Sequence, residues 1–184
     1  DINGETRSAS RTYYIGYTAL KLNIRLSSHL DRSKGNQVLT ISGSDLSGDP
    51  VKAAGTIRVY RIKSPKKILR KRLWHQPDQF LIDRETYDRL FPNDVYRDED
   101  IQQKWPKERK MQERAFDTGK TKRYQLAGLR EWPCGRYLVE LSSFDRYGNK
   151  IKGQKYFTLF DLNEKQMPVR SLDWFHVKKR SLEP

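Results

Sequence analysis

Cysteine is nearly absent from this chain of 184 residues, which contains only Cys134. A single cysteine excludes an internal disulfide and a zinc site made of several cysteines, so a small disulfide-stapled domain is excluded as well. Long apolar runs are also missing, because no segment approaches the roughly 18 consecutive apolar residues of a membrane helix. The sequence therefore predicts no membrane span.

Apolar residues are scarce and make up 35% of the chain. With glycine included, their share stays below the roughly 45–50% that is typical of globular proteins. Several segments nevertheless alternate between apolar and polar residues, which favours a folded core with a large polar surface over disorder. The length is sufficient for one large domain or two small ones.

Positive charge is abundant, with 37 Lys and Arg against 23 Asp and Glu and a net charge of +14. Such a balance permits a polyanion partner, for example nucleic acid, a heparin-like glycan or an anionic membrane surface. It does not demand one, because a solvated basic surface is the common reason for an excess of cations.

The clearest pattern lies at 135–160, where two runs rich in β-branched and aromatic residues flank the turn-forming residues 145–149. In the first run Tyr137, Val139 and Leu141 share one face, and the second run alternates in the same way. A period of two around a glycine-containing turn predicts an antiparallel β-hairpin.

Other segments also have strand-like patterns. In Leu20–Leu26 every apolar side chain lies on one face, as in an antiparallel sheet with one solvated face. Leu129 and Tyr137 flank the corner before the hairpin, much as in the tyrosine corner of immunoglobulin-type sandwiches. Six or seven strands with short turns favour an all-β sandwich over a barrel or an α/β fold. The further predicted strands are 37–42, 55–63 and 122–129.

The alternation fails between residues 64 and 117, and we expect a long, partly helical insertion there. Asp83 is expected to cap a short helix that ends near Phe91, because an acidic cap, an acidic first turn and a following proline mark helix boundaries. Residues 98–104 are expected to form a second helical turn. A connection this long inside a domain is typically a functional insertion or an ordered excursion.

Several of these residues together resemble one family. The residues are Asp1–Arg7 and Asp145–Lys150, which echo one another, and then Gly48-Asp-Pro-Val51, Ile57–Ile62, Leu73–Asp78, Phe91-Pro92 and Gly135–Glu140. They look like the late hairpin and the strands of macroglobulin domains in the alpha-2-macroglobulin-like proteins of Bacteroides-type bacteria.

The resemblance implies a seven-stranded, antiparallel, fibronectin-like β-sandwich that repeats along a longer protein. Residues 1–17 would be the closing hairpin arm of a preceding macroglobulin domain. Residues 18–161 would form one complete sandwich with an insertion at 64–117, and residues 162–184 would be a linker and the start of the next domain. The chain begins with Asp1 rather than Met, and we expect it to be an interior fragment.

The family is associated with protease trapping, in which a bait segment is cut and a Cys-x-Glu-Gln thioester captures the protease. Cys134 is followed by Gly-Arg-Tyr and cannot be that thioester cysteine. The resemblance therefore implies a non-catalytic structural module whose partners are neighbouring domains, within a parent protein that inhibits endopeptidases. It also implies a place in the cell envelope, either periplasmic or surface-exposed.

Residues suited to catalysis or metal binding do not form a recognisable pattern. His29, His75 and His176 are far apart in sequence and have no metal-ligand spacing. Neither a His-Glu-x-x-His nor a Gly-x-Ser-x-Gly motif occurs. We therefore expect no catalytic residue, no metal and no cofactor.

A basic run supports an alternative function. No acidic residue occurs between Asp49 and Asp78, and the 52–74 region mixes cations with apolar and aromatic side chains. Such a cluster could bind a polyanion or a protein partner. Alternatively, its apolar residues dock on the sandwich and its cations face solvent, since no nucleic-acid-binding motif occurs. The candidate surface comprises Lys63, Lys66, Lys67, Arg70, Lys71, Arg72 and Trp74.

Overall fold

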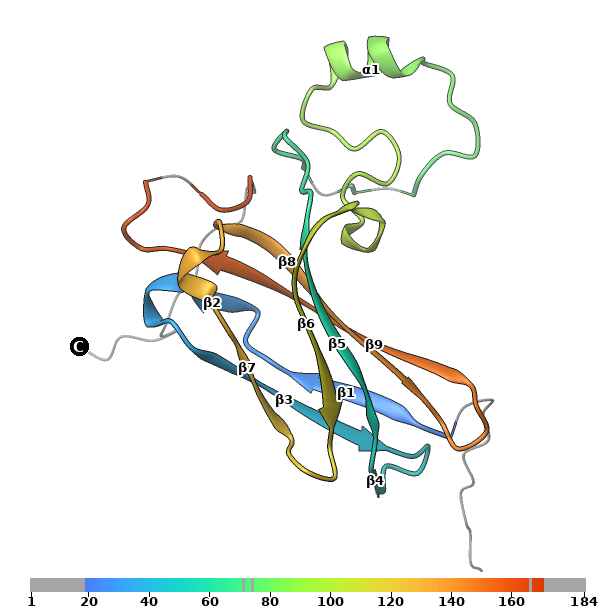
Figure 1. Cartoon of the computed structure of the whole chain (residues 1–184). Helices are drawn as coiled ribbons and strands as arrows, with labels where there is room; N and C mark the ends of the chain where they lie inside the picture. Colours follow the sequence, from blue (N-terminus) through green and yellow to red (C-terminus); the bar gives the residue numbers. More distant parts are fainter. Residues whose placement is uncertain (1–18, 71, 74, 166, 171–184) are drawn as a thin grey trace, which may run out of the picture.

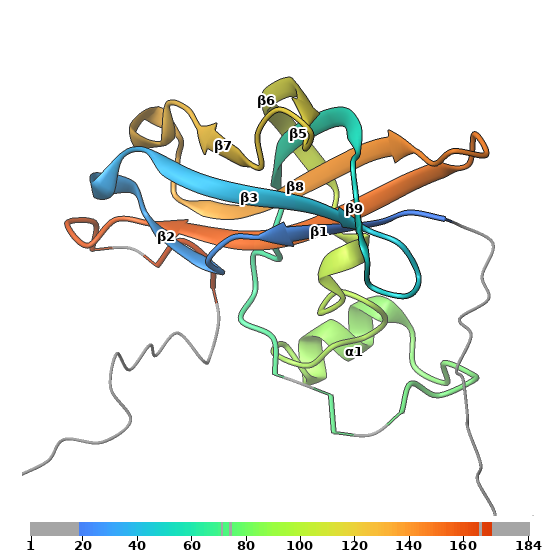
Figure 2. The same ribbon diagram turned by 90° about the horizontal axis from the view of Figure 1, so that it is seen from below.

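The computed structural model of the chain describes residues 19–170 except 71, 74 and 166. The fold in this part is an all-β sandwich with little helix, as predicted, and its two sheets pack face to face (Figures 1 and 2). The expected hairpin arm at 1–17 and the end of the expected linker lie outside the described residues.

The smaller sheet has four strands, and β3 is paired with the other three. Residues 40–44 of β3 pair with β1, residues 43–44 with β4, and residues 37–40 with β7. All of its pairings are antiparallel. The strands are β1 (Lys21–Arg25), β3 (Gln37–Ser44), β4 (Pro50–Val51) and β7 (Arg123–Leu126).

The larger sheet has the order β2-β9-β8-β5-β6. Its strands are β2 (His29–Asp31), β5 (Ala54–Ile62), β6 (Lys107–Asp117), β8 (Gly135–Phe144) and β9 (Lys150–Phe160). The prediction of a purely antiparallel fold was wrong at one edge, because β2 pairs with β9 in parallel. Only three residues connect β1 in the smaller sheet to β2 in the larger one. The chain does not reverse its direction in this connection, as it would have to for β2 to run antiparallel to β9.

The described part of the chain contains nine strands, whereas seven were expected. The additional strands are β2 and β4, which have three and two residues. An alternating pattern needs about four residues to be recognised, so strands this short leave no readable signal in the sequence.

The predicted insertion at 64–117 extended too far, because its last eleven residues form β6. This strand lies at the edge of the sheet and most of its side chains are exposed. Charged residues occupy positions on both of its faces, so the alternation that reveals a half-buried strand is absent. The residues between β5 and β6, numbers 63–106, are called the insertion below.

The hydrophobic core lies between the two sheets and is centred on the predicted hairpin. Tyr137, Val139 and Leu141 of β8 are fully buried, and so are Phe157 and Leu159 of β9. The rings of Tyr137 and Phe157 stack with centroids 5.2 Å apart. The opposing sheet contributes four buried residues of β3 and β7, namely Leu39, Ile41, Tyr124 and Leu126.

The tyrosine corner is present before β8. Tyr137 donates its hydroxyl hydrogen bond to the carbonyl oxygen of Pro133. Burial raises the pKa of Tyr137 to about 12, so the phenol stays protonated at neutral pH. The ring also stacks on Trp132 at a centroid distance of 5.4 Å. This corner follows a short 3-10 helix, η3 (Leu129–Glu131), whose Leu129 is buried.

Asp145 organises the turn between β8 and β9. Its carboxylate accepts hydrogen bonds from the backbone N–H groups of Tyr147 at 2.9 Å, Asn149 at 2.8 Å and Ala19 at 3.1 Å. Burial alone would raise the pKa of Asp145, but these donors outweigh it and lower the pKa to about 2. The bond to Ala19 attaches the start of the described chain to this turn.

This arrangement predicts an acid-sensitive contribution of Asp145 to stability. An unfolded aspartate has a pKa of about 3.9, whereas the folded one titrates near 2. The folded state therefore binds fewer protons, and the contribution is complete above about pH 4 and is lost as the pH falls through about 2. In thermal melts, the difference in melting temperature between wild type and Asp145→Asn should become smaller as the pH is lowered from 7 to 2. The exposed Asp78→Asn variant should show no such difference; an unchanged difference for Asp145→Asn would contradict the prediction.

The insertion lies beside one end of the sandwich, near the start of β8 (Figures 1 and 2). The predicted helix is confirmed as α1 (Arg84–Leu90), and the Asp83 carboxylate caps it by accepting a 2.9 Å hydrogen bond from the N–H of Thr86. The second predicted turn is present as a shorter 3-10 helix, η2 (Gln102–Lys104). No helix in the described ranges is long and apolar enough to cross a bilayer.

Candidate interaction surface on the insertion

The insertion has a small aromatic core of its own. The ring of Tyr96 lies 4.7 Å from that of Phe80 and 5.0 Å from that of Tyr87, measured between centroids. Tyr87 also contacts Phe91 at 5.1 Å. Tyr96 and the neighbouring Val95 are buried. This cluster explains why a segment with so little regular structure is ordered.

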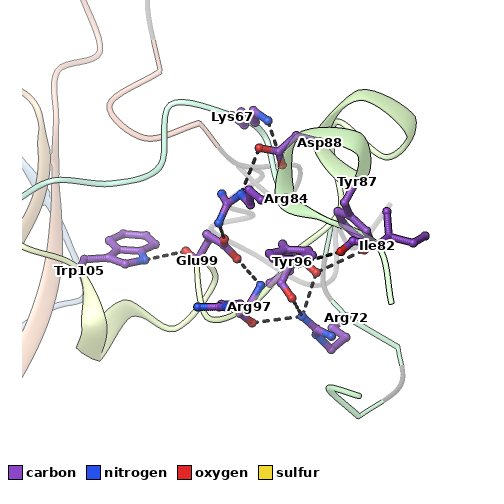
Figure 3. A network of polar contacts seen from close by, with 11 residues as sticks. Lys67, Arg72, Ile82, Arg84, Tyr87, Asp88, Tyr96, Arg97, Glu99 and Trp105 are labelled. Carbon is purple, nitrogen blue, oxygen red and sulfur yellow. Dashed lines mark hydrogen bonds and ion pairs between the residues drawn. The ribbon is translucent and has the colours of Figure 1, made fainter. Parts of the chain in front are cut away.

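Arg84 joins α1 to the end of the insertion (Figure 3). Its guanidinium forms ion pairs with Asp88 at 3.2 Å and with Glu99 at 2.5 Å, and it lies 5.4 Å above the ring of Tyr96. Burial would lower the pKa of Arg84, but these carboxylates raise it overall. The same contact with Arg84, and then one with Lys67, lowers the pKa of Asp88.

Three residues of the candidate basic surface form polar contacts with this part of the insertion, although Lys67 and Arg70 stay exposed to solvent. Lys67 Nζ lies 3.3 Å from the carboxylate of Asp88, and Arg70 Nε lies 2.7 Å from that of Asp94. The carbonyl oxygens of the three residues 95–97 converge on Arg72 Nη2 at 2.8, 3.1 and 3.1 Å. These cations connect the first part of the insertion to its second part.

Charge explains this arrangement. The segment 78–100 contains eight acidic and three basic residues, so the basic run and the acidic segment that follows it are complementary. A polyanion at Lys67 or Arg70 would have to displace carboxylates that are already in place. Lys63 and Lys66 remain exposed, whereas Lys71 and Trp74 lie outside the described residues. The structure thus brings together only part of the predicted surface.

The apolar residues of the basic run only partly dock as the second interpretation expected. Leu69 lines a cavity next to the larger sheet, but Ile68 is 39% exposed and Leu73 is 87% exposed. The run is therefore neither a buried strap nor a uniformly exposed basic patch. Its main contacts are polar and lie within the insertion.

Replacement of Arg72 tests whether these contacts order the insertion. Arg72→Met removes a charged donor from three carbonyl oxygens, and such bonds are worth roughly 1.5–3 kcal/mol. If the free energy of local opening falls by about 2 kcal/mol, amide hydrogen exchange in residues 93–97 should become roughly 30-fold faster. The sandwich should be unaffected. The exposed Arg89→Met variant is the control, and equal exchange in both variants would contradict the proposed role.

Sequence reasoning missed two residues that lie at the cavity beside the insertion. Arg136 is on the outer face of β8, opposite to Tyr137, and Gln102 is in η2. Arg136 Nη2 donates a 2.8 Å hydrogen bond to Gln102 Oε1, and Nη1 donates to the hydroxyl of Thr158. An arginine between buried residues of a central strand was a visible signal for Arg136. Nothing in the sequence marks Gln102.

Of the groups considered for catalysis or metal binding, His176 lies outside the described residues. Cys134 has a pKa raised to about 11, first by burial and then by its hydrogen bond with Glu164, so its thiol is protonated at neutral pH. Within the ranges that the structure describes, no three His, Cys, Asp or Glu residues form a group that could hold a metal ion.

The comparisons with known proteins do not assign the chain to a family. No family model matches the sequence, and a search of the curated proteins finds no match either.

Proposed function

We propose that the chain is a non-catalytic β-sandwich module of an alpha-2-macroglobulin-like protein, in which it spaces and orients neighbouring domains. The parent protein would inhibit endopeptidases, in the periplasm or on the surface of the cell envelope. The partners of the module would be the adjacent domains of the same long chain. Target proteases would bind elsewhere in the parent.

The position of the two points where the chain enters and leaves the sandwich supports this proposal most. Ala19 is held at the turn between β8 and β9 by Asp145, whereas Asp161 directly follows the far end of β9. A strand of eleven residues is about 35 Å long at the usual rise per residue. Segments attached at these two points would lie at opposite ends of the sandwich, as in a series of domains.

The exit is also fixed to the sandwich. Arg32 pairs with Asp161 at 2.8 Å and with Glu164 at 2.9 Å. Further along, Arg170 Nη1 donates a 2.6 Å hydrogen bond to the carbonyl oxygen of Lys66 at the base of the insertion. A module that sets the direction of the chain after it requires such attachments, because a free linker would not transmit orientation.

The arrangement of strands is compatible with the seven-stranded type that the resemblance implies. Immunoglobulin-type sandwiches have the strands A, B and E in one sheet and C, F and G in the other. Here β1-β3-β7 and β9-β8-β5 give the same neighbours. Seven of the strands have four residues or more, and the tyrosine corner occupies its usual place at the start of β8, the first strand of the hairpin.

The coding sequence on both sides of the chain tests the proposal. We expect further β-domains of roughly one hundred residues there, and a strand immediately before Asp1 that completes the hairpin with residues 13–17. A start codon and a short leader directly before Asp1, with no β-domain on either side, would overturn the proposal.

A protease assay is an independent test. The chain alone should leave the hydrolysis of a large protein substrate by trypsin or subtilisin unchanged at equimolar concentration, whereas the parent protein should inhibit both. Stoichiometric inhibition by the chain alone would show that inhibition resides in this module and would contradict a purely architectural role.

A further inference from the structure

A cavity of about 310 Å³ lies between the insertion, the outer face of the larger sheet and residues 169–170. Its size is at the lower end of the range for small-ligand sites. Both apolar and polar side chains line it. The lining includes Leu69, Gln102, Trp105, Arg136, Thr158 and Val169.

Arg136 brings a positive charge to this cavity without a matching negative one. Its guanidinium donates to Thr158 and to Gln102, both neutral. Among the described residues no carboxylate lies within ion-pair distance of it, and burial lowers the pKa of Arg136. Three of the five N–H donors of a guanidinium are then left for other acceptors. Arg136 is half-buried, and a charge that is partly removed from water is ordinarily paired, so this guanidinium can accommodate an anionic acceptor.

Gln102 provides a second, independent indication. Its Oε1 atom accepts the bond from Arg136, which fixes the orientation of the side-chain amide. Its Nε2 atom is consequently directed away from Arg136. This Nε2 atom is buried and has no hydrogen-bond acceptor in the described part of the chain. Unsatisfied buried amides are rare, because each loses its hydration without compensation.

We propose that this cavity binds a carboxylate, whose oxygens accept hydrogen bonds from the guanidinium of Arg136 and from the Nε2 amide of Gln102. Planar bidentate recognition of a carboxylate is what a guanidinium does best. The neighbouring ring of Trp105 and the side chains of Leu69 and Val169 would contact the apolar part of the ligand. The site is independent of the proposed architectural function.

The charges around the cavity select a carboxylate over a phosphate. Glu99 and Asp100 also line it. Glu99 is already paired with Arg84, so Asp100 is the carboxylate that would repel a second negative charge on the ligand. Lys67 lines the cavity too, but it is already paired with Asp88. Arg170 lines the cavity as well, and its Nη1 donates to a neutral carbonyl oxygen, that of Lys66. Once the paired groups are set aside, Arg136, Arg170 and Asp100 remain with a net charge of +1, which matches a ligand with a single negative charge.

Titration of the full chain with sodium acetate tests the proposal. In ¹H–¹⁵N spectra, the Nε–H signal of Arg136 and the side-chain amide signals of Gln102 should shift together and saturate. With only four non-hydrogen atoms, acetate should bind with a Kd of roughly millimolar. Acetamide, which has the same shape but no charge, and sodium chloride at equal ionic strength should give no saturable shift.

Three variants separate the site from a general effect of charge. Arg136→Gln should weaken acetate binding at least tenfold, and Gln102→Met should weaken it several-fold. Arg146→Gln removes an equally positive side chain from the exposed turn at the other end of the sandwich, and it should bind acetate like wild type. Overlay of the sandwich amide signals shows that each variant is folded.

A capped peptide with one glutamate, acetyl-Gly-Glu-Gly-amide, distinguishes the two sources of a carboxylate. Binding at least tenfold tighter than acetate would identify a protein side chain as the occupant, whereas binding of acetate without the peptide would identify a small free acid. The proposal is overturned if acetamide shifts the same signals, if no saturation occurs below about 100 mM, or if Arg136→Gln binds acetate as wild type does.

Discussion

Replacement of Tyr137 by alanine is expected to cost about 3–5 kcal/mol of unfolding free energy, which is the usual loss for a large aromatic side chain in a core. Tyr137 is fully buried, stacks on both Trp132 and Phe157, and fixes the corner through Pro133. A typical domain is stable by only about 5–15 kcal/mol. Urea denaturation followed by tryptophan fluorescence would measure the loss.

Two further variants separate packing from the corner hydrogen bond. Tyr137→Phe keeps both ring contacts and removes only the hydroxyl, so it should cost about 1–1.5 kcal/mol. Tyr147→Ala removes a tyrosine that is 67% exposed in the turn between β8 and β9, and its effect should stay within about 0.5 kcal/mol. If Tyr137→Ala lowers the unfolding free energy no more than Tyr137→Phe does, the stacked ring does not stabilise the core.

Replacement of the whole insertion, residues 63–106, by Asn-Gly is expected to leave a folded sandwich. Ile62 and Lys107 are direct partners in the pairing of β5 with β6, and the N–H of Lys63 donates to the carbonyl oxygen of Pro106 at 2.9 Å. Two residues of this type connect paired strands in a tight hairpin turn. Exposure of Ile62 should cost about 1.5–3 kcal/mol.

The measurements for this deletion are cooperative unfolding and acetate binding. A single transition should persist with a modest loss of stability, and binding at Arg136 should disappear because Gln102 and Trp105 are removed. As a control, Asn-Gly is inserted at Gly48 in the turn between β3 and β4, and this variant should still bind acetate. Loss of folding in the deletion would show that the insertion belongs to the core of the domain.

The parts of the fold that could be predicted are those in which one face of a strand meets water. Alternation between buried and solvated residues is visible in the sequence at Tyr137–Leu141, and the acidic cap at Asp83 is equally local. β6 escaped prediction because an exposed, charged edge has no such contrast. The three residues of β2 escaped because their pairing depends on β9, more than a hundred residues away.

The candidate site was less predictable for a related reason. The basic run was visible as composition, but the partners of its cations are set by the folding of an irregular loop. Arg70 meets Asp94 across 24 residues, and Arg136 meets Gln102 across 34. No periodicity links such positions. The sequence therefore shows where the positive charges lie along the chain, but not which groups they contact in the fold.

The charges of β6 also have a consequence for crowded or repeated copies of this fold. The strand ends the larger sheet in the described part of the chain, so one of its edges has no strand paired with it there. Lysine, arginine and glutamate side chains along such an edge oppose the docking of another sheet and the growth of aggregates. The first eight residues of β6, Lys-Glu-Arg-Lys-Met-Gln-Glu-Arg, would keep adjacent sandwiches separate even at high local concentration.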